Sequence, residues 1–345
     1  MPHTTIGRTL VTERDDLLLR LMLSDATFLT TKEKTLVQNA VDDCAQFASL
    51  SVADISEIVK RDIKRAAWNG KESLAKAQTA AKLISALKIS WTAWDRTDFP
   101  SMLTEMPDPP YMLFYRGKLE CLTSPCVSVV GTRRATPGAR KATEDFARDA
   151  AEDGLTVVSG LAYGIDSHAH KGSLLSAAGQ TAAVLPSGID TITPSAHTRL
   201  AARLLQKGGL ILSEYTPGTP ALSFRFVQRN RIIAALSPVT VVTQAPAGSG
   251  ALITADYALS YGRDVMLHAE CFSPAAEQIE NANLHDLRAK AAIGKKVAHK
   301  LENSVRRYRE DGAPVIASYA EYKQCRAAAP GTVFCKRDAA QGELF

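Results

Sequence analysis

The spacing of apolar residues changes near residue 90, and this change predicts two structurally different regions. Before it, apolar side chains recur at mixed three- and four-residue intervals, as at Leu17, Leu21, Val37 and Val41. Such spacing places them on one face of successive helices. Ser51, with Asp54 three residues later, is suited to capping one of these helices. We predict a small helical, SAM-like domain over residues 1–90, with no chemistry of its own.

The pattern beyond residue 125 predicts strands that alternate with helices. Short apolar runs alternate with amphipathic segments, and the runs are VSVV, TVVSG, TAAVLPSG, LILSEY, VTVVTQA, DVMLHA and PVIASY. This alternation predicts βαβ units and an α/β fold with a doubly wound, mostly parallel sheet. We assign the α/β domain to residues 126–325.

Three further segments depart from this alternation. Residues 91–125 contain four prolines within 100–110, which forbid a continuous helix and predict a proline-rich connector. A basic helical insertion is expected at about 271–311, and a flexible tail over 326–345.

Composition narrows the class of protein. The chain has 345 residues, of which 46% are hydrophobic, as expected of a globular protein with a large core. Its net charge of +5 is mildly basic and does not by itself indicate a binding partner. Neither a signal-peptide pattern nor an apolar stretch of membrane-spanning length is present. Six scattered cysteines without a CxxC pair indicate reduced thiols, so we expect a cytoplasmic protein without membrane contact.

Polar residues gather where the predicted strands end. Parallel strands bind ligands beyond their carboxyl ends. The residues at these ends are Gly131, Thr132, Arg133, Arg134, Ser159, Gly160, Ser187, Gly188, Ser213, Glu214, Tyr215, Gln244, Gly248, Ser249 and Gly250. Their hydroxyls, glycines and guanidinium groups predict a crevice that binds phosphate. The alternative is that the two arginines only make a loop at the sheet edge soluble in water and bind no ligand.

Predicted helix starts support the phosphate hypothesis. Thr136 before Pro137 is a suitable cap and first turn, and Ser249 or Asp166 can cap later helices. A helix N-terminus offers free N–H groups to an anion, and Arg133 adds a planar fork that matches phosphate oxygens.

A second cluster of charged and aromatic residues is the segment SFRFVQRNRIIAALS. In a helix, Ile232 and Ile233 face the core, whereas Arg225 and Arg229 share another face with aromatic residues beside them. Aromatic rings beside cations suit single-stranded nucleic acid. The alternative is that the two phenylalanines of this segment belong to the core and the arginines form a charged, solvent-exposed face.

Other chemistries lack the residues they need. His168 and His170 form an H-x-H pair without further metal ligands at the strand ends, and no G-x-S-x-G motif is present. Ile253 occupies the third glycine position of a dinucleotide motif, and no Walker lysine motif occurs. We therefore expect neither a metal nor a cofactor.

Several motifs together resemble the DNA-processing protein A (DprA, or Smf) family. They include VSVVGTRRAT, VVSGLAYGIDSHAH, AAVLPSGIDTITP, FVQRNRIIAALS and SGALITADYALSYGRDV, in the family's order. The resemblance implies an extended Rossmann-like domain in a non-catalytic protein that binds and protects single-stranded DNA during natural transformation. It also implies loading of RecA recombinase and action as a homodimer.

The resemblance also implies DNA-binding residues. The G-[ST]-R arginine falls on Arg133, and the F-x-x-R-N-R motif on Phe226, Arg229, Asn230 and Arg231, with structural pairing of the last two arginines, for example to Glu214, as a further role. The full predicted set is Arg133, Arg134, Thr136, Ser159, Gly160, Arg225, Phe226, Arg229, Asn230, Arg231, Ser249, Gly250 and Thr254. Ser223 replaces a basic residue of the family, for which Arg225 is a substitute, and the segment from 268 to 311 diverges.

Two alternatives complete the sequence-based hypotheses. The same crevice could hold a small nucleotide, as in a sensor or a nucleotide-cleaving enzyme, although APAGSGALIT lacks the glutamate of that signature. The terminal QGELF resembles a peptide that docks on the sliding clamp through Gln341, Leu344 and Phe345. A frayed tail is the simpler interpretation of these last residues.

Overall fold

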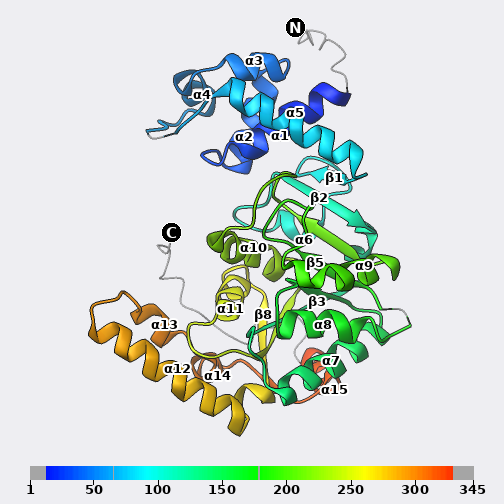
Figure 1. Ribbon diagram of the computed structural model, residues 1–345, viewed down its shortest axis with the longest axis vertical. Coiled ribbons are helices and arrows are strands. Elements are labelled where there is room, and N and C mark those ends of the chain that lie inside the picture. Colours follow the sequence, from blue (N-terminus) through cyan, green and yellow to red (C-terminus); the bar gives the residue numbers. More distant parts are fainter. Residues whose placement is uncertain (1–12, 65, 178, 329–345) are drawn as a thin grey trace.

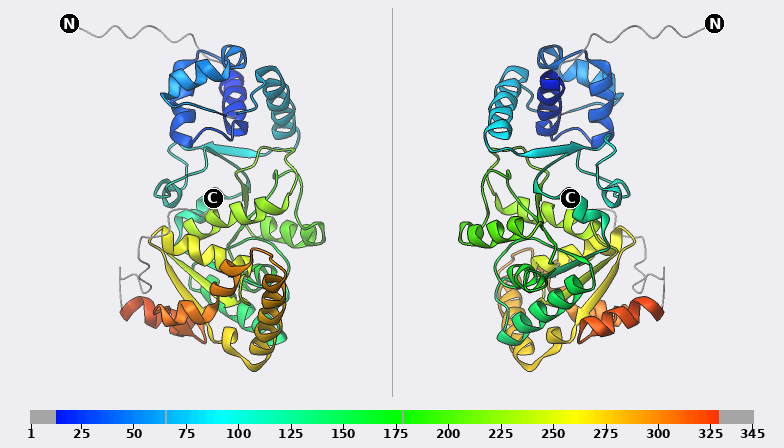
Figure 2. Two further views of the ribbon diagram at one scale, coloured as in Figure 1. Left: turned by 90° about the vertical axis from the view of Figure 1, so that its left-hand side faces the viewer. Right: turned by 90° about the vertical axis from the view of Figure 1, so that its right-hand side faces the viewer.

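Among the residues that the structure describes, five helices form the N-terminal part, at one end of the long axis of the molecule (Figures 1 and 2). The computed structural model describes residues 13–64, 66–177 and 179–328. Ser51 starts α4 as expected, because its hydroxyl accepts the Asp54 N–H and Asp54 in turn accepts the Ser51 N–H. The helices are α1 (Glu13–Asp25), α2 (Thr31–Ala40), α3 (Cys44–Ser49), α4 (Val52–Val59) and α5 (Gly70–Ala86).

The segment expected to be a connector contributes two strands to the sheet. β1 (Ser90–Ala93) and β2 (Met112–Gly117) pair antiparallel with each other, and β2 pairs with β6 (Leu210–Ser213). The four prolines within residues 100–110 lie between the two strands, near the short α6 (Ser101–Thr104), so they do not interrupt strand pairing. The sequence pattern did not predict these strands.

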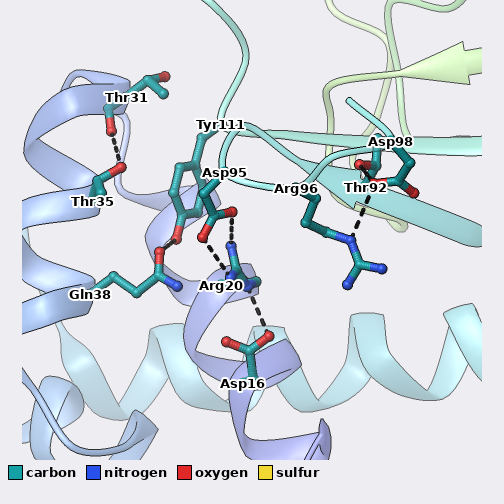
Figure 3. A network of polar contacts seen from close by, with 10 residues as sticks. All are labelled: Asp16, Arg20, Thr31, Thr35, Gln38, Thr92, Asp95, Arg96, Asp98 and Tyr111. Carbon is teal, nitrogen blue, oxygen red and sulfur yellow. Dashed lines mark hydrogen bonds and ion pairs between the residues drawn. The ribbon is translucent and has the colours of Figure 1, made fainter. Parts of the chain in front are cut away.

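Polar contacts join the helices to this two-stranded extension (Figure 3). Arg20 of α1 donates to both carboxylate oxygens of Asp95, at 2.7 and 2.9 Å, and to Asp16 at 2.8 Å. The Tyr111 hydroxyl donates to Gln38 at 2.6 Å. The Arg20 guanidinium holds the pKa of Asp95 below its usual range. One apolar core also joins these parts, because it extends from the N-terminal helices to β2, β5 (Thr181–Val184) and β6.

The sheet has nine strands in the order β1-β2-β6-β5-β4-β3-β7-β8-β9, and its last seven strands are parallel. The predicted α/β class is therefore confirmed, and each of the seven apolar runs contains a strand. Strand order reverses between β3 and β7. The remaining strands are β3 (Cys126–Gly131), β4 (Thr156–Ser159), β5 (Thr181–Val184), β7 (Val239–Gln244), β8 (Asp264–His268) and β9 (Val315–Ile316).

Helices cover both faces of the sheet, as a doubly wound fold requires (Figure 1). Phe146 and Tyr319 pack over Val127 and Val129 on one face, whereas Ile232 and Tyr308 belong to the core of the other. The helices are α7 (Pro137–Glu152), α8 (Ile165–Ser173), α9 (Thr198–Gln206), α10 (Ser223–Ala235), α11 (Gly250–Ser260), α12 (Pro274–Ala292), α13 (Ala298–Glu302), α14 (Val305–Glu310) and α15 (Tyr319–Ala328). Short 3-10 turns are η1 (Leu119–Thr123), η2 (Ser195–His197) and η3 (Ala269–Phe272).

Within the described ranges, no helix has both the length and the apolar character that a bilayer span needs. The expected basic insertion contains α12, α13 and α14. The tail residues Gln341, Leu344 and Phe345 lie outside the described residues.

Candidate functional site

A cleft of about 680 Å³ lies beyond the carboxyl ends of β3 and β7, where the strand order reverses. Open α/β sheets bind ligands at such a switch point, because the loops after the two strands diverge there. The predicted residues that line it are Arg133, Arg134, Phe226, Arg229, Asn230, Ser249, Gly250 and Thr254. Residues from three separate stretches of sequence therefore meet at one site.

The loop after β3 presents two cations to the cleft. Arg133 and Arg134 are exposed, and neither forms an ion pair with any residue that the structure describes. The guanidinium carbon of Arg133 lies 5.0 Å from the centroid of the Phe226 ring, within the range of a cation–π interaction. The turn needs Gly131, since a Cβ there would lie 2.4 Å from the Ile165 side chain. Both guanidinium groups are thus available to an anion.

Two helices begin beside these arginines. Thr136 caps α7, where its hydroxyl accepts the Ala139 N–H at 3.2 Å, and Ser249 caps α11. Both predicted caps are confirmed. Gly250 is the first residue of α11, and a Cβ built on it would meet nothing within 4 Å. The exposed Gly250 at the start of α11 is therefore open to a ligand, and the positive end of the helix dipole favours an anion there.

The floor of the cleft contains a buried arginine beside a buried carboxyl group. Arg229 is only 3% exposed and donates to the carbonyl oxygens of Gly160, at 2.6 Å, and Val184. Burial lowers the pKa of Arg229 to about 10, so the group remains charged at neutral pH. Burial also raises the pKa of Asp166, and the positive charge of Arg229 opposes that rise.

This position of Arg229 differs from the expected outer helix face shared with Arg225. The reason is Gly160, because a Cβ there would lie 2.3 Å from the Arg229 guanidinium. Without that side chain, the guanidinium reaches the strand ends and joins them to α10. Arg229 therefore stabilises the floor of the cleft, and only a small part of the Arg229 side chain is accessible to a ligand.

The other predicted residues do not line the cleft. They are Thr136, Ser159, Gly160, Arg225 and Arg231. Ser159 is buried and donates to the Val129 carbonyl at 2.7 Å. Arg225 donates to the Pro220 carbonyl and lies over the rings of Tyr215 and Phe224.

Arg231 belongs to a separate cluster of ion pairs, and its predicted pairing with Glu214 is present. It forms an ion pair with Glu214, and its Nε lies 3.4 Å from Asp108. Burial raises the pKa of Glu214, and the charge of Arg231 opposes this rise. These contacts hold α10 to the segment after β6 and, through the Asp108 carbonyl, to the proline-containing segment. The neighbouring Asn230 has a different partner, because its amide donates to the Gly250 carbonyl at 3.1 Å.

Two polar residues that line the cleft, Asn283 and Asp166, were not predicted as part of the site. Asn283 of α12 lines it and donates from Nδ2 to the Ala247 carbonyl at 2.6 Å. An isolated asparagine in a divergent segment gives no signal in one sequence. Asp166, expected as a helix cap, instead follows the start of α8, where Gly164 (φ +75°) holds the cap position. The backbone of Ala162 and Gly160 at the cleft floor, like the charge of Arg229, opposes the rise that burial causes in the pKa of its carboxyl group.

The histidine pair has structural partners. Nδ1 of His168 lies 2.7 Å from Oε1 of Glu144, and Nδ1 of the fully buried His170 lies 2.7 Å from the Thr181 hydroxyl. Both rings thus hold α8 against neighbouring elements.

Comparison with known proteins identifies similar sequences. Residues 90–304 match the model of the family described as DNA recombination-mediator protein A. Protein Smf of Synechocystis sp. is 44% identical over 175 residues, which cover 50% of this chain and 44% of that protein. DNA processing protein DprA of Streptococcus pneumoniae is 42% identical over 167 residues, or 48% and 58% of the two chains. The chain spans about half the length of these two relatives.

A longer match and two solved structures extend the comparison. Protein Smf of Borreliella burgdorferi is 30% identical over 248 residues, covering 72% of this chain and 78% of that protein. The crystal structure of the S. pneumoniae protein covers 90% of this chain and 97% of its own, with a TM-score of 0.64 and 28% identity. DNA processing protein A of Helicobacter pylori, solved for its single-stranded DNA binding mode, covers 69% and 96%, with a TM-score of 0.54 and 25% identity.

Proposed function

Because the chain belongs to the DNA recombination-mediator protein A family, we propose that its switch-point cleft binds single-stranded DNA. The observation that carries the proposal is the placement of Arg133 over the Phe226 ring at this cleft. A phosphate accepts hydrogen bonds from the guanidinium group, while a base stacks on aromatic surface nearby. The combination suits a strand with unpaired bases, since the bases of a duplex are already stacked on one another.

The proposed contacts fall into two groups. Arg133, Arg134 and the first turn of α11 bind phosphates, and Phe226 stacks a base. Arg229 and Asp166 hold the floor, and Thr136, Ser159 and Gly160 support the loops that carry the contacts. Arg225 and Arg231 stabilise α10 and its surroundings.

We further propose that binding is non-catalytic and delivers the strand to a recombinase. Guanidinium groups bind anions but do not exchange protons at neutral pH, which supports a role in binding. The family description as a recombination mediator supports delivery to RecA, and the relatives named for DNA processing support a role in natural transformation. We propose that the protein acts as a cytoplasmic homodimer.

Fluorescence anisotropy with three labelled probes tests the proposal. A 20-nucleotide oligo(dT), the matching duplex and a labelled mononucleotide are titrated with the wild-type protein. We expect tight binding of the single strand and at least tenfold weaker binding of the duplex. The cleft volume of about 680 Å³ would also hold a small nucleotide. Tight binding of the mononucleotide, without binding of oligo(dT), would therefore favour a nucleotide sensor or nucleotide-cleaving enzyme instead.

A further inference from the structure

The α12–α13 segment is attached directly to the loop that borders the cleft after β7. Ala247 donates its N–H to Glu280 at 2.7 Å and accepts from Asn283 at 2.6 Å. The Gly248 N–H donates to the Asn303 carbonyl at 2.8 Å. Ala247 also packs with Leu287 and Val297 in a small apolar cluster. The segment therefore forms a fixed wall of the cleft, to which Asn283 contributes a lining side chain.

One lysine of this wall, Lys300, lies next to the cleft. A Cβ built on Gly248, which lines the cleft, would lie 2.6 Å from the Cβ of Lys300, so the stem of Lys300 runs along the loop. Lys295, Lys296 and Lys300 are exposed, and none has an ion-pair partner among the described residues. Lys290 in the same segment, by contrast, pairs with Asp286. Lys295 and Lys296 lie in the turn between α12 and α13, and Lys300 lies on α13.

We infer that Lys295, Lys296 and Lys300 extend the binding site, so that a strand leaving the cleft past Gly248 continues over this basic wall. The inference rests on the proposed function. Unpaired lysines near a polyanion site lower the free energy of binding by releasing counterions, without reading sequence. A short oligonucleotide fills the cleft alone, whereas a longer one also reaches the wall.

A triple variant, K295A/K296A/K300A, tests the inference with two probes. Oligo(dT) of 6 and of 20 nucleotides is titrated by anisotropy between 50 and 300 mM salt. We expect the variant to bind the 20-mer at least tenfold more weakly, with a log–log salt slope smaller by about 2, because each phosphate contact contributes about 0.7. Binding of the 6-mer should change less than threefold.

A control with the same loss of charge separates local contact from net charge. Lys71, Lys82 and Lys207 are exposed, lie on α5 and at the end of α9, and have no ion-pair partner within the described residues. The variant K71A/K82A/K207A should bind both probes as wild type does. Equal binding of the 20-mer by wild type and K295A/K296A/K300A would overturn the inference while leaving the cleft proposal intact. Failure of wild type to bind either probe would overturn both.

Discussion

Arg133 and Phe226 lie one over the other, with the guanidinium carbon 5.0 Å from the ring centroid. The first residue follows β3 and the second belongs to α10, so the contact joins two walls of the cleft. Phe226 is partly exposed, and its ring therefore both orients Arg133 and offers surface to a base. This pairing of charge and aromatic surface leads to the predictions below.

Replacing Phe226 with leucine should weaken single-strand binding. Loss of base stacking costs about 1–3 kcal/mol, so we expect the Kd for oligo(dT) to rise about 5- to 150-fold. Phe224 provides the control, because this residue is 51% exposed and does not line the cleft. Anisotropy titrations of F226L and F224L at one salt concentration make the comparison. Equal affinities would remove Phe226 from the binding site.

Two glycines near the cleft should respond differently to alanine. A Cβ on Gly160 would collide with the Arg229 guanidinium, so G160A should lower the free energy of unfolding by about 1–3 kcal/mol. A Cβ on Gly250 meets open space, so G250A should leave stability unchanged or slightly raised. It should nevertheless weaken oligo(dT) binding severalfold, because the methyl group narrows the approach to α11. Urea denaturation and anisotropy measure the two effects; a stable G160A would contradict the steric account.

Arg231 should matter for stability and not for the salt dependence of DNA binding. Its ion pair with Glu214 is largely buried, with side-chain exposures of 13% and 15%. Removing one partner of a buried pair leaves a charge uncompensated and costs about 3–5 kcal/mol. We expect R231M to unfold at lower urea concentration while its folded form keeps the wild-type salt slope for oligo(dT). A reduced slope would place Arg231 on the path of the DNA.

Acid should destabilise the protein through His170. Burial lowers the pKa of this fully buried ring from 6.5 to about 3. Between these values the unfolded chain binds a proton that the folded chain does not, so stability falls as pH decreases from 6.5. The slope from this residue is at most about 1.4 kcal/mol per pH unit. Urea denaturation at pH 7, 6 and 5 should show a flatter dependence for H170Q, and parallel curves for the two proteins would exclude His170 as the cause.

The sequence predicted the parts of the fold that depend on local pattern. The seven apolar runs contain strands because a buried parallel strand needs an uninterrupted apolar stretch. Thr136, Ser249 and Ser51 act as caps because a cap depends only on residues within one turn. β1 and β2 were missed, since the intervening prolines suggested a continuous connector.

The candidate site was predicted in outline, and its details depend on contacts between distant segments. Arg133 and Ser249 could be placed because strand ends meet at one edge of a parallel sheet. The burial of Arg229 depends on Gly160, which is 69 residues away, and helical periodicity alone places this arginine on the outer face. Asn283 reaches the cleft only through the packing of α12 on Ala247.

The salt dependence of oligo(dT) binding by R133A tests the central claim most directly. Wild type, R133A and the control R203A, which removes an exposed arginine of α9, are titrated across a salt series. The account predicts at least tenfold weaker binding by R133A near 0.1 M salt and a log–log slope smaller by about 0.7, with R203A matching wild type. Identical affinity and slope for R133A and wild type would contradict the claim that the turn after β3 binds the phosphate backbone.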